Sequence, residues 1–324
     1  MIELKHITKT FRVVRREGGM KAAARALFKR SVTLVRALDD VSFSIGDGEM
    51  VGYIGPNGAG KSSTIKILCG ILTPDSGSCT IDGLTPWKDR KEHVKRIGVV
   101  FGQRTQLWWD VPVVDSFELI RDIYRVEEQK YRRNLNELTE LLDLAELMKT
   151  PARQLSLGQR MRCELAASLL HEPQILFLDE PTIGLDAVSK IAVRGFIKRV
   201  NRERGATVVL TTHDMQDIEA LTERILLIGK GKILLDGSLS ELKTRNSPFK
   251  TVTLTCSNGE FIVPHGISMK ERMDGRAVFA VDTRLISVSD AIAALTKSTE
   301  VADLSVTGAS AEEMVVSLYE EFSI

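Results

Sequence analysis

The stretch GPNGAGKS, residues 55–62, decides the expected fold of this chain. It matches the pattern G-x-x-x-x-G-K-[ST], and it lies between a strand pattern, MVGYI, and a helix pattern, SSTIKILCG. Glycines in such a loop allow successive backbone N–H groups to point inward as an anion nest, and the dipole of the following helix adds to the attraction. The stretch therefore predicts a phosphate-binding loop on an α/β core rather than an ordinary glycine-rich turn.

Four side chains in and beyond this loop predict nucleotide chemistry. Lys61 is expected to reach the β- and γ-phosphates, and Ser62 to ligate Mg²⁺. ILFLDE, residues 175–180, places Asp179 at the end of a buried strand, where a carboxylate is costly unless it binds a cation directly or through water. Glu180, the next residue, is positioned to orient or deprotonate the water that attacks the γ-phosphate.

Two more polar residues follow apolar strand patterns. Gln103 comes after RIGVVFG, and His213 ends the pattern TVVLTT. Taken alone, each would be an ordinary loop residue or strand terminus. The carboxyl ends of neighbouring parallel strands meet at one sheet edge, so we expect both side chains near the phosphate loop, with the Gln103 amide oxygen available to the metal.

The stretch SLGQ, residues 156–159, predicts a helix start. Ser156 followed three residues later by Gln159 is a capping-box spacing, in which each side chain satisfies a backbone N–H at the start of the helix. Gly158 fits this local interpretation poorly, because glycine weakens the first turn of a helix unless something approaches the backbone closely.

Composition sets limits on the kind of protein. The 324 residues are 43% hydrophobic, with 44 Lys plus Arg against 43 Asp plus Glu, so the net charge favours no polyanionic partner and no nucleic acid is expected. The four cysteines show no paired spacing, which favours buried thiols and a reducing compartment. No run approaches the roughly 18 apolar residues that span a bilayer, so a membrane role is expected to come through a partner.

Local sequence patterns predict several distinct segments within the first 245 residues. Residues 1–11 suit an edge strand, and residues 12–36 form a basic insertion with an alanine-rich helical middle. That insertion is either a solvated surface or a contact for anionic lipid or an acidic partner. DDVSFSIGDGEMVGYIG, residues 39–55, predicts two antiparallel strands around a turn, and RILLIGKGKILLDG, residues 224–237, predicts a hairpin.

The remaining residues, 246–324, predict a separate small α+β domain with no catalytic cluster. Strands are expected near 249–256, 276–282 and 300–307, and helices near 287–297 and from Ala311 onward.

Taken together and in this order, the motifs closely resemble the nucleotide-binding subunit of ABC transporters, over nearly all of residues 1–245. The resemblance implies a P-loop NTPase α/β core with an antiparallel β-subdomain and a helical subdomain at about residues 104–172. It also implies ATP and Mg²⁺ as ligands, and two subunits, expected to form a homodimer, that sandwich two ATP molecules.

The resemblance assigns roles by motif. Asp179 is the Walker B aspartate, Glu180 the catalytic glutamate, His213 the switch histidine and Gln103 the Q-loop glutamine that reaches the metal. Phe11, in ITKTF, stands where the family stacks an aromatic ring on adenine. The Walker A loop comprises Gly55, Pro56, Asn57, Gly58, Ala59, Gly60, Lys61, Ser62 and Ser63.

LSLGQ is then the signature motif, whose Ser156, Gly158 and Gln159 contact ATP on the opposite subunit, together with Asp186 of the D-loop. The chain departs from the family at Leu157, where glycine is commonest. Because Ser156 and Gly158 are kept, we expect an active site, with Leu157 reshaping that contact or slowing closure of the dimer.

VVFGQRTQLWWDVPVVDSFELIRDIY, residues 99–124, with LSLGQRMR and PTIGLD, is similar to ATPases of ABC-2 type exporters, especially a branch named for sodium extrusion (Nat-type). In that family the region of Trp108 and Trp109 receives the coupling helix of a membrane permease. Two adjacent tryptophans cannot both face one side of a regular element, so we expect at least one to be exposed or interfacial, with core packing as the alternative.

We therefore expect an ATP-hydrolysing subunit that powers a separate permease from the cytoplasmic side of a cell membrane, most simply in a prokaryote. The cargo, set by the permease, includes sodium ions or small lipophilic drugs and cations. The alternatives are a soluble ABC ATPase acting on ribosomes or DNA, disfavoured by the single phosphate loop, and a non-catalytic ATP sensor, disfavoured by Glu180 and His213.

Overall fold

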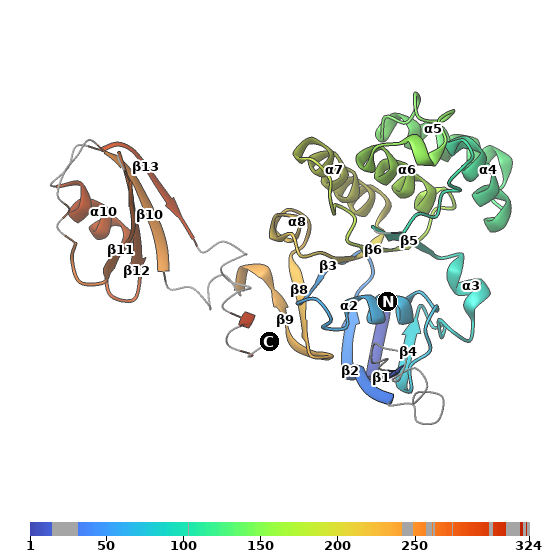
Figure 1. Ribbon diagram of the computed structural model, residues 1–324, viewed down its shortest axis with the longest axis horizontal. Helices are drawn as coiled ribbons and strands as arrows, with labels where there is room; N and C mark the ends of the chain where they lie inside the picture. The colour runs from blue at the N-terminus through green and yellow to red at the C-terminus, as the bar shows by residue number, and fades with distance from the viewer. Residues whose placement is uncertain are drawn as a thin grey trace, which may run out of the picture. The chain divides into compact units, whose positions relative to one another are not determined.

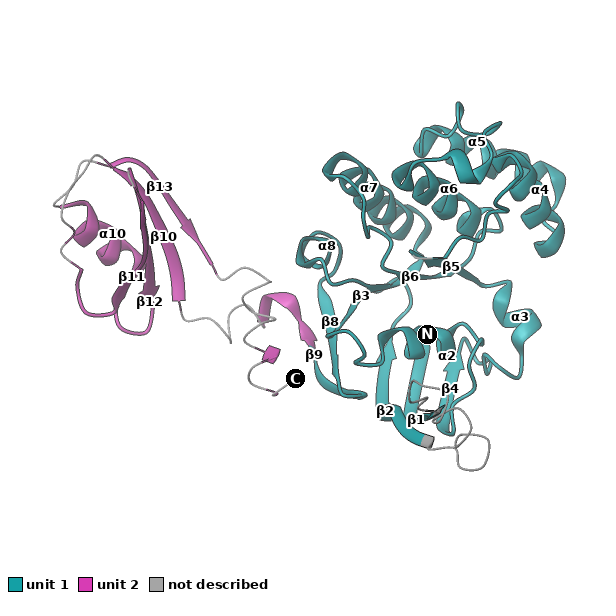
Figure 2. Ribbon diagram, viewed as in Figure 1, with its two compact units in different colours: residues 1–236 teal, residues 237–324 magenta. Residues whose placement is uncertain are grey.

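The computed structural model describes two compact units (Figure 2). They comprise residues 1–236 and 237–324, whereas the sequence analysis places the boundary between residues 245 and 246. The boundary between the units falls inside a strand, β9 (Lys232–Ser238), which is expected to lie wholly in the first domain. The structure describes residues 1–14, 32–102, 104–241, 249–256, 261, 263–273, 275–297, 301–308, 318–319 and 322.

The larger unit is built around a six-stranded sheet in the order β5-β6-β7-β3-β8-β9 (Figure 1). The pairs β5–β6, β6–β7, β7–β3 and β3–β8 are parallel. Buried, continuous apolar runs form the inner strands, as the sequence predicts for strands covered on both faces. These strands are β5 (Ile97–Phe101), β6 (Ile175–Asp179), β7 (Thr207–Thr211), β3 (Met50–Ile54) and β8 (Arg224–Gly229).

A second, antiparallel sheet has the order β2-β1-β4, formed by β1 (Ile2–Val14), β2 (Val32–Ile45) and β4 (Ser76–Ile81). Two expectations are wrong here. The strand from residue 2 is central rather than an edge, because β4 pairs along its second side. The strand ending at Ile45 pairs with β1 and not with β3, because β3 enters the parallel sheet between β7 and β8.

The helix α2 (Lys61–Leu68) packs with both sheets in one hydrophobic core. Ile65 and Leu68 from this helix meet Leu4 of β1 and Phe177 of β6 in that core, and all four are at most 1% exposed. Apolar burial of this extent is the main favourable term that holds the two sheets around α2. The four cysteines are all buried and free, as predicted: Cys69, Cys79, Cys163 and Cys256.

The expected helical subdomain consists of α4, α5 and α6, which gather on one side of the larger unit in Figure 1. None of the helices within the described ranges is long and apolar enough to cross a membrane. The helices of this unit beyond α2 are α3 (Arg90–Val94), α4 (Val113–Tyr124), α5 (Glu128–Leu141), the short η1 (Ala152–Gln154), α6 (Leu157–Leu169), α7 (Ala187–Arg204) and α8 (Met215–Leu221).

The smaller unit contains an antiparallel sheet in the order β11-β12-β10-β13, with its own core of eight buried residues. Ala291 and Leu295 of α10 (Val288–Thr296) pack into that core beside Phe279. The helix expected from Ala311 lies mostly outside the described residues. The strands are β10 (Phe249–Cys256), β11 (Ile267–Met273), β12 (Arg276–Asp282) and β13 (Val301–Thr307), of which β11 has no counterpart among the expected elements.

The basic insertion expected at residues 12–36 is shorter in the structure. Arg12 pairs with Leu34 and Arg36 pairs with Thr10, so both ends of the expected insertion belong to β1 and β2. The remaining residues, 15–31, lie outside the described residues, and with them the predicted alanine-rich helix.

Candidate functional site

The loop between β3 and α2 has a backbone that only glycine fits at two positions. A Cβ atom on Gly55 would lie 2.1 Å from the carbonyl oxygen of Ile228. Gly60 has a φ of 118°, and a Cβ atom there would lie 2.6 Å from the carbonyl oxygen of Ala37. The loop is therefore pressed against its neighbours on one side, while its other side faces a cavity.

Lys61 is the first residue of α2, and its side chain folds back over the loop. Its Nζ atom donates to the carbonyl oxygens of Gly55, at 2.5 Å, and Pro56, at 3.2 Å. Burial lowers the pKa of Lys61, and the nearby carboxylates of Glu180 and Asp179 oppose that shift only in part. A buried ammonium group with carbonyl partners suits an incoming polyphosphate.

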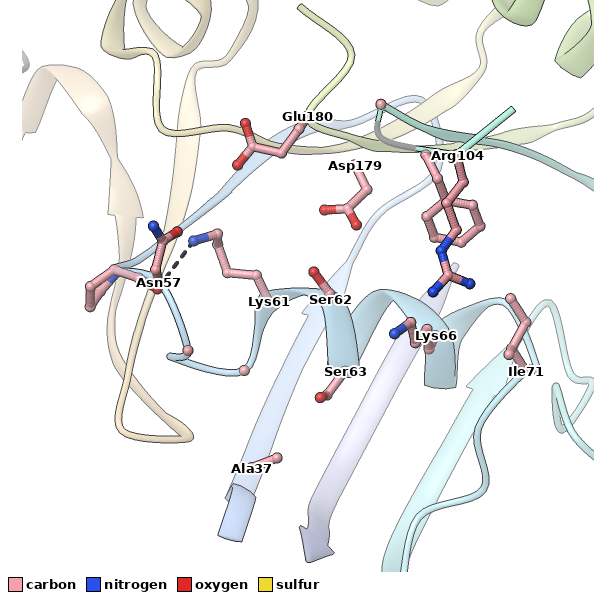
Figure 3. Close-up of a pocket in the computed structure, with 15 residues that line it drawn as sticks. Ala37, Asn57, Lys61, Ser62, Ser63, Lys66, Ile71, Arg104, Asp179 and Glu180 are labelled. Atoms are coloured by element: carbon pink, nitrogen blue, oxygen red, sulfur yellow. Dashed lines mark hydrogen bonds between the residues drawn. The ribbon is translucent and has the colours of Figure 1, made fainter. Parts of the chain in front are cut away.

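The cavity beside this loop has a volume of about 430 Å³ (Figure 3). Asp179 and Glu180 face the phosphate loop across it, and in Figure 3 the Ser62 hydroxyl points toward the Asp179 carboxylate. The lining comprises Ala37, Pro56, Asn57, Gly58, Gly60, Lys61, Ser62, Ser63, Lys66, Ile71, Phe101, Gly102, Arg104, Asp179 and Glu180.

The strand register brings the catalytic candidates to one sheet edge, as predicted. Asp179 is the partner of Thr211 in the β6–β7 ladder, and the Thr211 hydroxyl donates to Asp179 Oδ1 at 2.5 Å. His213 follows two residues later, with Nδ1 2.8 Å from Glu180 Oε2. Glu180 has a φ of 56°, a conformation rare for residues with a side chain and frequent at functional sites.

The side chains at this edge fit Mg²⁺. No group of three or more His, Cys, Asp or Glu side chains able to hold a metal occurs among the described residues. Mg²⁺ needs none, because it is usually held by one or two protein oxygens with phosphates and water completing the shell. Ser62 and Asp179 supply hard oxygen atoms of that kind.

Gln103 itself lies outside the described residues, but both of its neighbours are at this edge. The backbone N–H of Gly102 donates to the carbonyl oxygen of Asp179 at 2.7 Å, and Arg104 lines the cavity. The metal role expected for Gln103 therefore stays a prediction.

The helix start at Ser156 has the predicted capping box. The backbone N–H of Gln159 donates to Ser156 Oγ at 3.2 Å, and the backbone N–H of Ser156 donates to Gln159 Oε1 at 2.9 Å. Neither residue lines the cavity of its own chain, and neither do Gly158 and Asp186. The structure therefore does not bring these four residues to the phosphate loop of the same chain.

Leu157 packs against the loop that follows Glu180, and Gly158 packs against the first turn of α7, which comes after that loop. A Cβ atom on Gly158 would lie 2.6 Å from Ser189 Oγ. This close approach explains why a glycine stands in the first turn of α6. Leu157 Cδ2 occupies the space beside Gly184, where a Cβ atom would lie 2.7 Å away. Asp186 caps α7 by accepting from the backbone N–H of Ser189 at 2.9 Å.

Three more predicted residues lie on the surface. Trp108 is 59% exposed and Trp109 is 48% exposed, so both tryptophans are exposed and neither is a core residue. Phe11 on β1 is 37% exposed and is not among the cavity residues, although Ala37 on the neighbouring strand is. The adenine-stacking role of Phe11 stays a prediction.

Sequence reasoning missed two cations of the cavity, Lys66 and Arg104. Lys66 is five positions after Lys61 on α2, and Arg104 directly follows Gln103. The position next to Gln103 was the available signal for Arg104, whereas nothing in the helix pattern marks Lys66 as a cavity residue.

Comparisons with known proteins agree with this geometry. A family model described as ABC transporter matches residues 38–183. The ABC transporter ATP-binding protein NatA of Bacillus subtilis is 31% identical over 215 residues, which cover 66% of this chain and 87% of NatA. The linearmycin resistance ATP-binding protein LnrL of Bacillus subtilis is 32% identical over 225 residues, which cover 69% of this chain and 72% of LnrL.

Among solved structures, the dimeric post-hydrolysis state of the ATP-binding cassette MJ0796 bound to ADP and Pi aligns with a TM-score of 0.62 and 29% identity. The alignment covers 74% of this chain and 99% of that chain. These comparisons confirm the expected fold, a P-loop NTPase core of the ABC ATPase type. They also bear out ATPase activity, with ATP as substrate and Mg²⁺ as cofactor.

Proposed function

Since this chain belongs to the family of ABC transporter ATP-binding proteins, we propose that it powers an ABC-2 type export system through a separate membrane permease. The name of one relative supports export, since LnrL is named for linearmycin resistance. The cargo proposed is a sodium ion or a small lipophilic drug or cation. The relatives do not favour the alternative of an ABC ATPase unconnected with transport.

The observation that carries the proposed mechanism is the position of the helix start at Ser156. The first turn of α6 is fully formed and capped, yet it takes no part in lining the cavity of its own chain. A helix N-terminus with N–H groups directed outward attracts phosphate. We propose that Ser156, Gly158, Gln159 and Asp186 complete the cavity of a second copy, so that two chains sandwich two ATP molecules.

Within each cavity, this chain's residues divide the work. Lys61 and the loop N–H groups hold the β- and γ-phosphates. Ser62 and Asp179, with Gln103, would hold Mg²⁺, which would supply positive charge to offset that of the phosphates. Glu180 orients the attacking water and accepts its proton, because its carboxylate faces the cavity beside that edge. His213, at 2.8 Å, fixes the orientation of Glu180.

The sandwich is tested with Glu180→Gln. This variant should bind ATP without hydrolysing it, and should elute as a dimer at saturating Mg²⁺ and ATP and as a monomer with ADP. Light scattering on the eluted peak gives the mass directly. A monomer at saturating ATP, with the permease present and ATP binding intact, contradicts the sandwich.

Export is tested by purifying the chain with its permease and reconstituting both into vesicles. Flux of sodium, or of a drug from a lipophilic panel, that requires ATP and stops in the Glu180→Gln complex supports the proposal. Sodium-independent turnover without sodium flux eliminates sodium as the cargo. Turnover that no permease changes and no cargo stimulates contradicts export itself.

A further inference from the structure

Glu164 is a buried carboxylate near the middle of α6, and it is not a cavity residue. Its side chain is 3% exposed. Burial of a carboxylate is unfavourable unless hydrogen bonds compensate for the lost water. The partners of Glu164 therefore show what this position does.

Those partners all belong to the segment that follows β5. Glu164 Oε1 accepts from the hydroxyl of Thr105, and both carboxylate oxygens accept from the backbone N–H of Gln106, at 3.1 and 3.2 Å. The Gln106 side-chain amide donates back to the carbonyl oxygen of Glu164 at 3.1 Å. One residue of α6 thus fixes two consecutive residues of an otherwise irregular loop.

The exposed tryptophans stand directly on this fixed backbone. Leu107, the residue between the Glu164 contacts and Trp108, is 3% exposed and anchors the loop in the interior. The backbone N–H of Trp108 donates to Ser116 Oγ of α4 at 3.1 Å. Trp108 and Trp109 are therefore exposed aromatic groups on an anchored stretch of backbone.

A second contact joins α6 to the same surface. The guanidinium of Arg160 lies 5.7 Å from the ring centroid of Trp109, within the range of a cation–π interaction. Arg160 and Glu164 are four residues apart, so they lie on the same face of α6. At its far end α6 is pressed against β5, where a Cβ atom on Gly98 would lie 2.4 Å from the carbonyl oxygen of Ser168.

The first turn of α6 has two separate attachments: Leu157 lies beside Gly184 in the loop after Glu180, and Gly158 lies beside Ser189 in the first turn of α7. One helix therefore contacts the tryptophan surface with its middle and the D-loop with its start. Because an α-helix transmits displacement along its axis with little bending, the two contact regions are mechanically connected.

We propose that Glu164 is a positioning residue that makes the Trp108–Trp109 surface and the helix start at Ser156 move as one body. This inference rests on the proposed function, in which the permease meets the tryptophans and ATP of the second copy meets Ser156. Glu164 acts through the loop and touches neither ligand. A permease movement at the tryptophans then changes the position of the signature turn.

The first arm of the test uses the full chain without nucleotide and measures backbone hydrogen exchange by mass spectrometry. Glu164→Ala should raise exchange about tenfold in peptides covering 105–109, and also in peptides covering 156–160. Thr105→Ala, which removes one donor from the exposed side, should do the same to a smaller extent. Glu164→Gln keeps an acceptor oxygen at the same reach and should largely restore protection.

Glu140→Ala is the matched control, because Glu140 is exposed on α5 in the same helical subdomain. It should leave exchange in both regions unchanged. If Glu164→Ala raises exchange only at 105–109, Glu164 is a local loop anchor and the proposal is wrong. Because the exchange measurement is made without nucleotide, it tests the proposal even if the sandwich dimer itself is disproved.

The second arm uses the reconstituted complex with permease. Glu164→Ala should lower permease-stimulated kcat about tenfold while KM for ATP stays unchanged, since Glu164 does not line the cavity. Counting bound ATP per chain excludes a loss of folded protein. Unchanged permease stimulation in Glu164→Ala overturns the proposal, whereas absence of stimulation in the parent complex contradicts the proposed function instead.

Discussion

The two helix starts that we assign to phosphate, α2 by its cavity and α6 by proposal, are capped in opposite ways. The start of α2 has Gly60 at its N-cap, in a left-handed conformation and with no side-chain cap. The start of α6 has Ser156 at its N-cap with a complete capping box. The α2 start leaves its N–H groups for a ligand that its own cavity holds, and the α6 start is already stable without one.

The difference in capping separates a helix start that needs a bound anion from one that is stable without it. An uncapped helix start is unfavourable until an anion arrives, so α2 and its loop form one half of a ligand site. In the capping box Ser156 Oγ accepts from a backbone N–H, and its own proton remains free to donate. The α6 start is therefore stable without a ligand, as the proposed opening and closing of a dimer would require.

The largest effect is expected from Lys61→Ala, which tests the phosphate site at the start of α2. This removes an ammonium group that donates to two phosphate-loop carbonyls, and kcat/KM for ATP should fall about 10²–10³-fold. Steady-state ATP hydrolysis measures it. Lys198→Ala on α7, which is exposed, serves as the control and should keep full activity. A loss below about tenfold would mean that loop N–H groups alone bind the phosphates.

Substitution of the two helix-start glycines, Gly60 and Gly158, should lower the free energy of unfolding by different amounts. Gly60→Ala introduces a side chain at φ 118° and against a backbone oxygen, and should lower the free energy of unfolding by about 2–4 kcal/mol. Gly158→Ala meets side-chain atoms rather than backbone, chiefly Ser189 Oγ at 2.6 Å and Ser189 Cβ at 3.3 Å, and should cost about 1 kcal/mol. Urea unfolding followed by tryptophan fluorescence reports this unit, since all three tryptophans belong to it. Equal costs would contradict the contrast.

Ser156→Ala tests whether the α6 cap has a second role. Loss of an N-cap hydroxyl should cost about 1 kcal/mol of stability, measured by circular dichroism in urea. Turnover by the ATP-dependent dimer should also fall about tenfold, while ATP affinity of the single chain stays unchanged. Ser287→Ala removes the equivalent cap of α10 in the smaller unit and should cost similar stability without loss of turnover. Full turnover in Ser156→Ala would mean that Ser156 acts only as a helix cap and has no role in ATP hydrolysis.

The smallest effect is expected from Leu157→Gly, which restores the residue commonest in the family. Glycine in a helical first turn costs up to about 1 kcal/mol, and the packing beside Gly184 is lost. Turnover should change less than about threefold, because the backbone N–H groups that face phosphate are kept. The same kinetic and urea measurements apply. A large gain in turnover would show that Leu157 restrains closure.

The α2 region could be predicted from the sequence almost residue by residue, because its signals are local. Glycine positions, the following lysine and the apolar runs that end at Asp179 and His213 each reflect a short-range constraint, and the parallel register joins them. Arg104 and Lys66 were missed because their place in the cavity depends on how α2 packs beside the end of β5.

Strand partners were less predictable. The Gly-Asp-Gly turn after Ile45 looks like a hairpin, yet Met50 pairs with Val208, far along the chain. Short turns favour hairpins only when no other strand offers a better-packed partner. The strand β11 was missed for another reason: six of its seven residues are exposed, so its sequence lacks the alternation that marks a half-buried strand.

The last ladder pair of β1 and β2 joins Val14 to Val32 and closes the chain around residues 15–31. Since the entropy of closing a loop changes only with the logarithm of its length, such a segment is open to replacement at little thermodynamic cost. The stretch between Val14 and Val32 is therefore a suitable position for replacing one sequence with another. Grafting a short turn, an affinity tag or the corresponding segment of a relative between these two valines would separate what the basic residues contribute from what the ATPase does by itself.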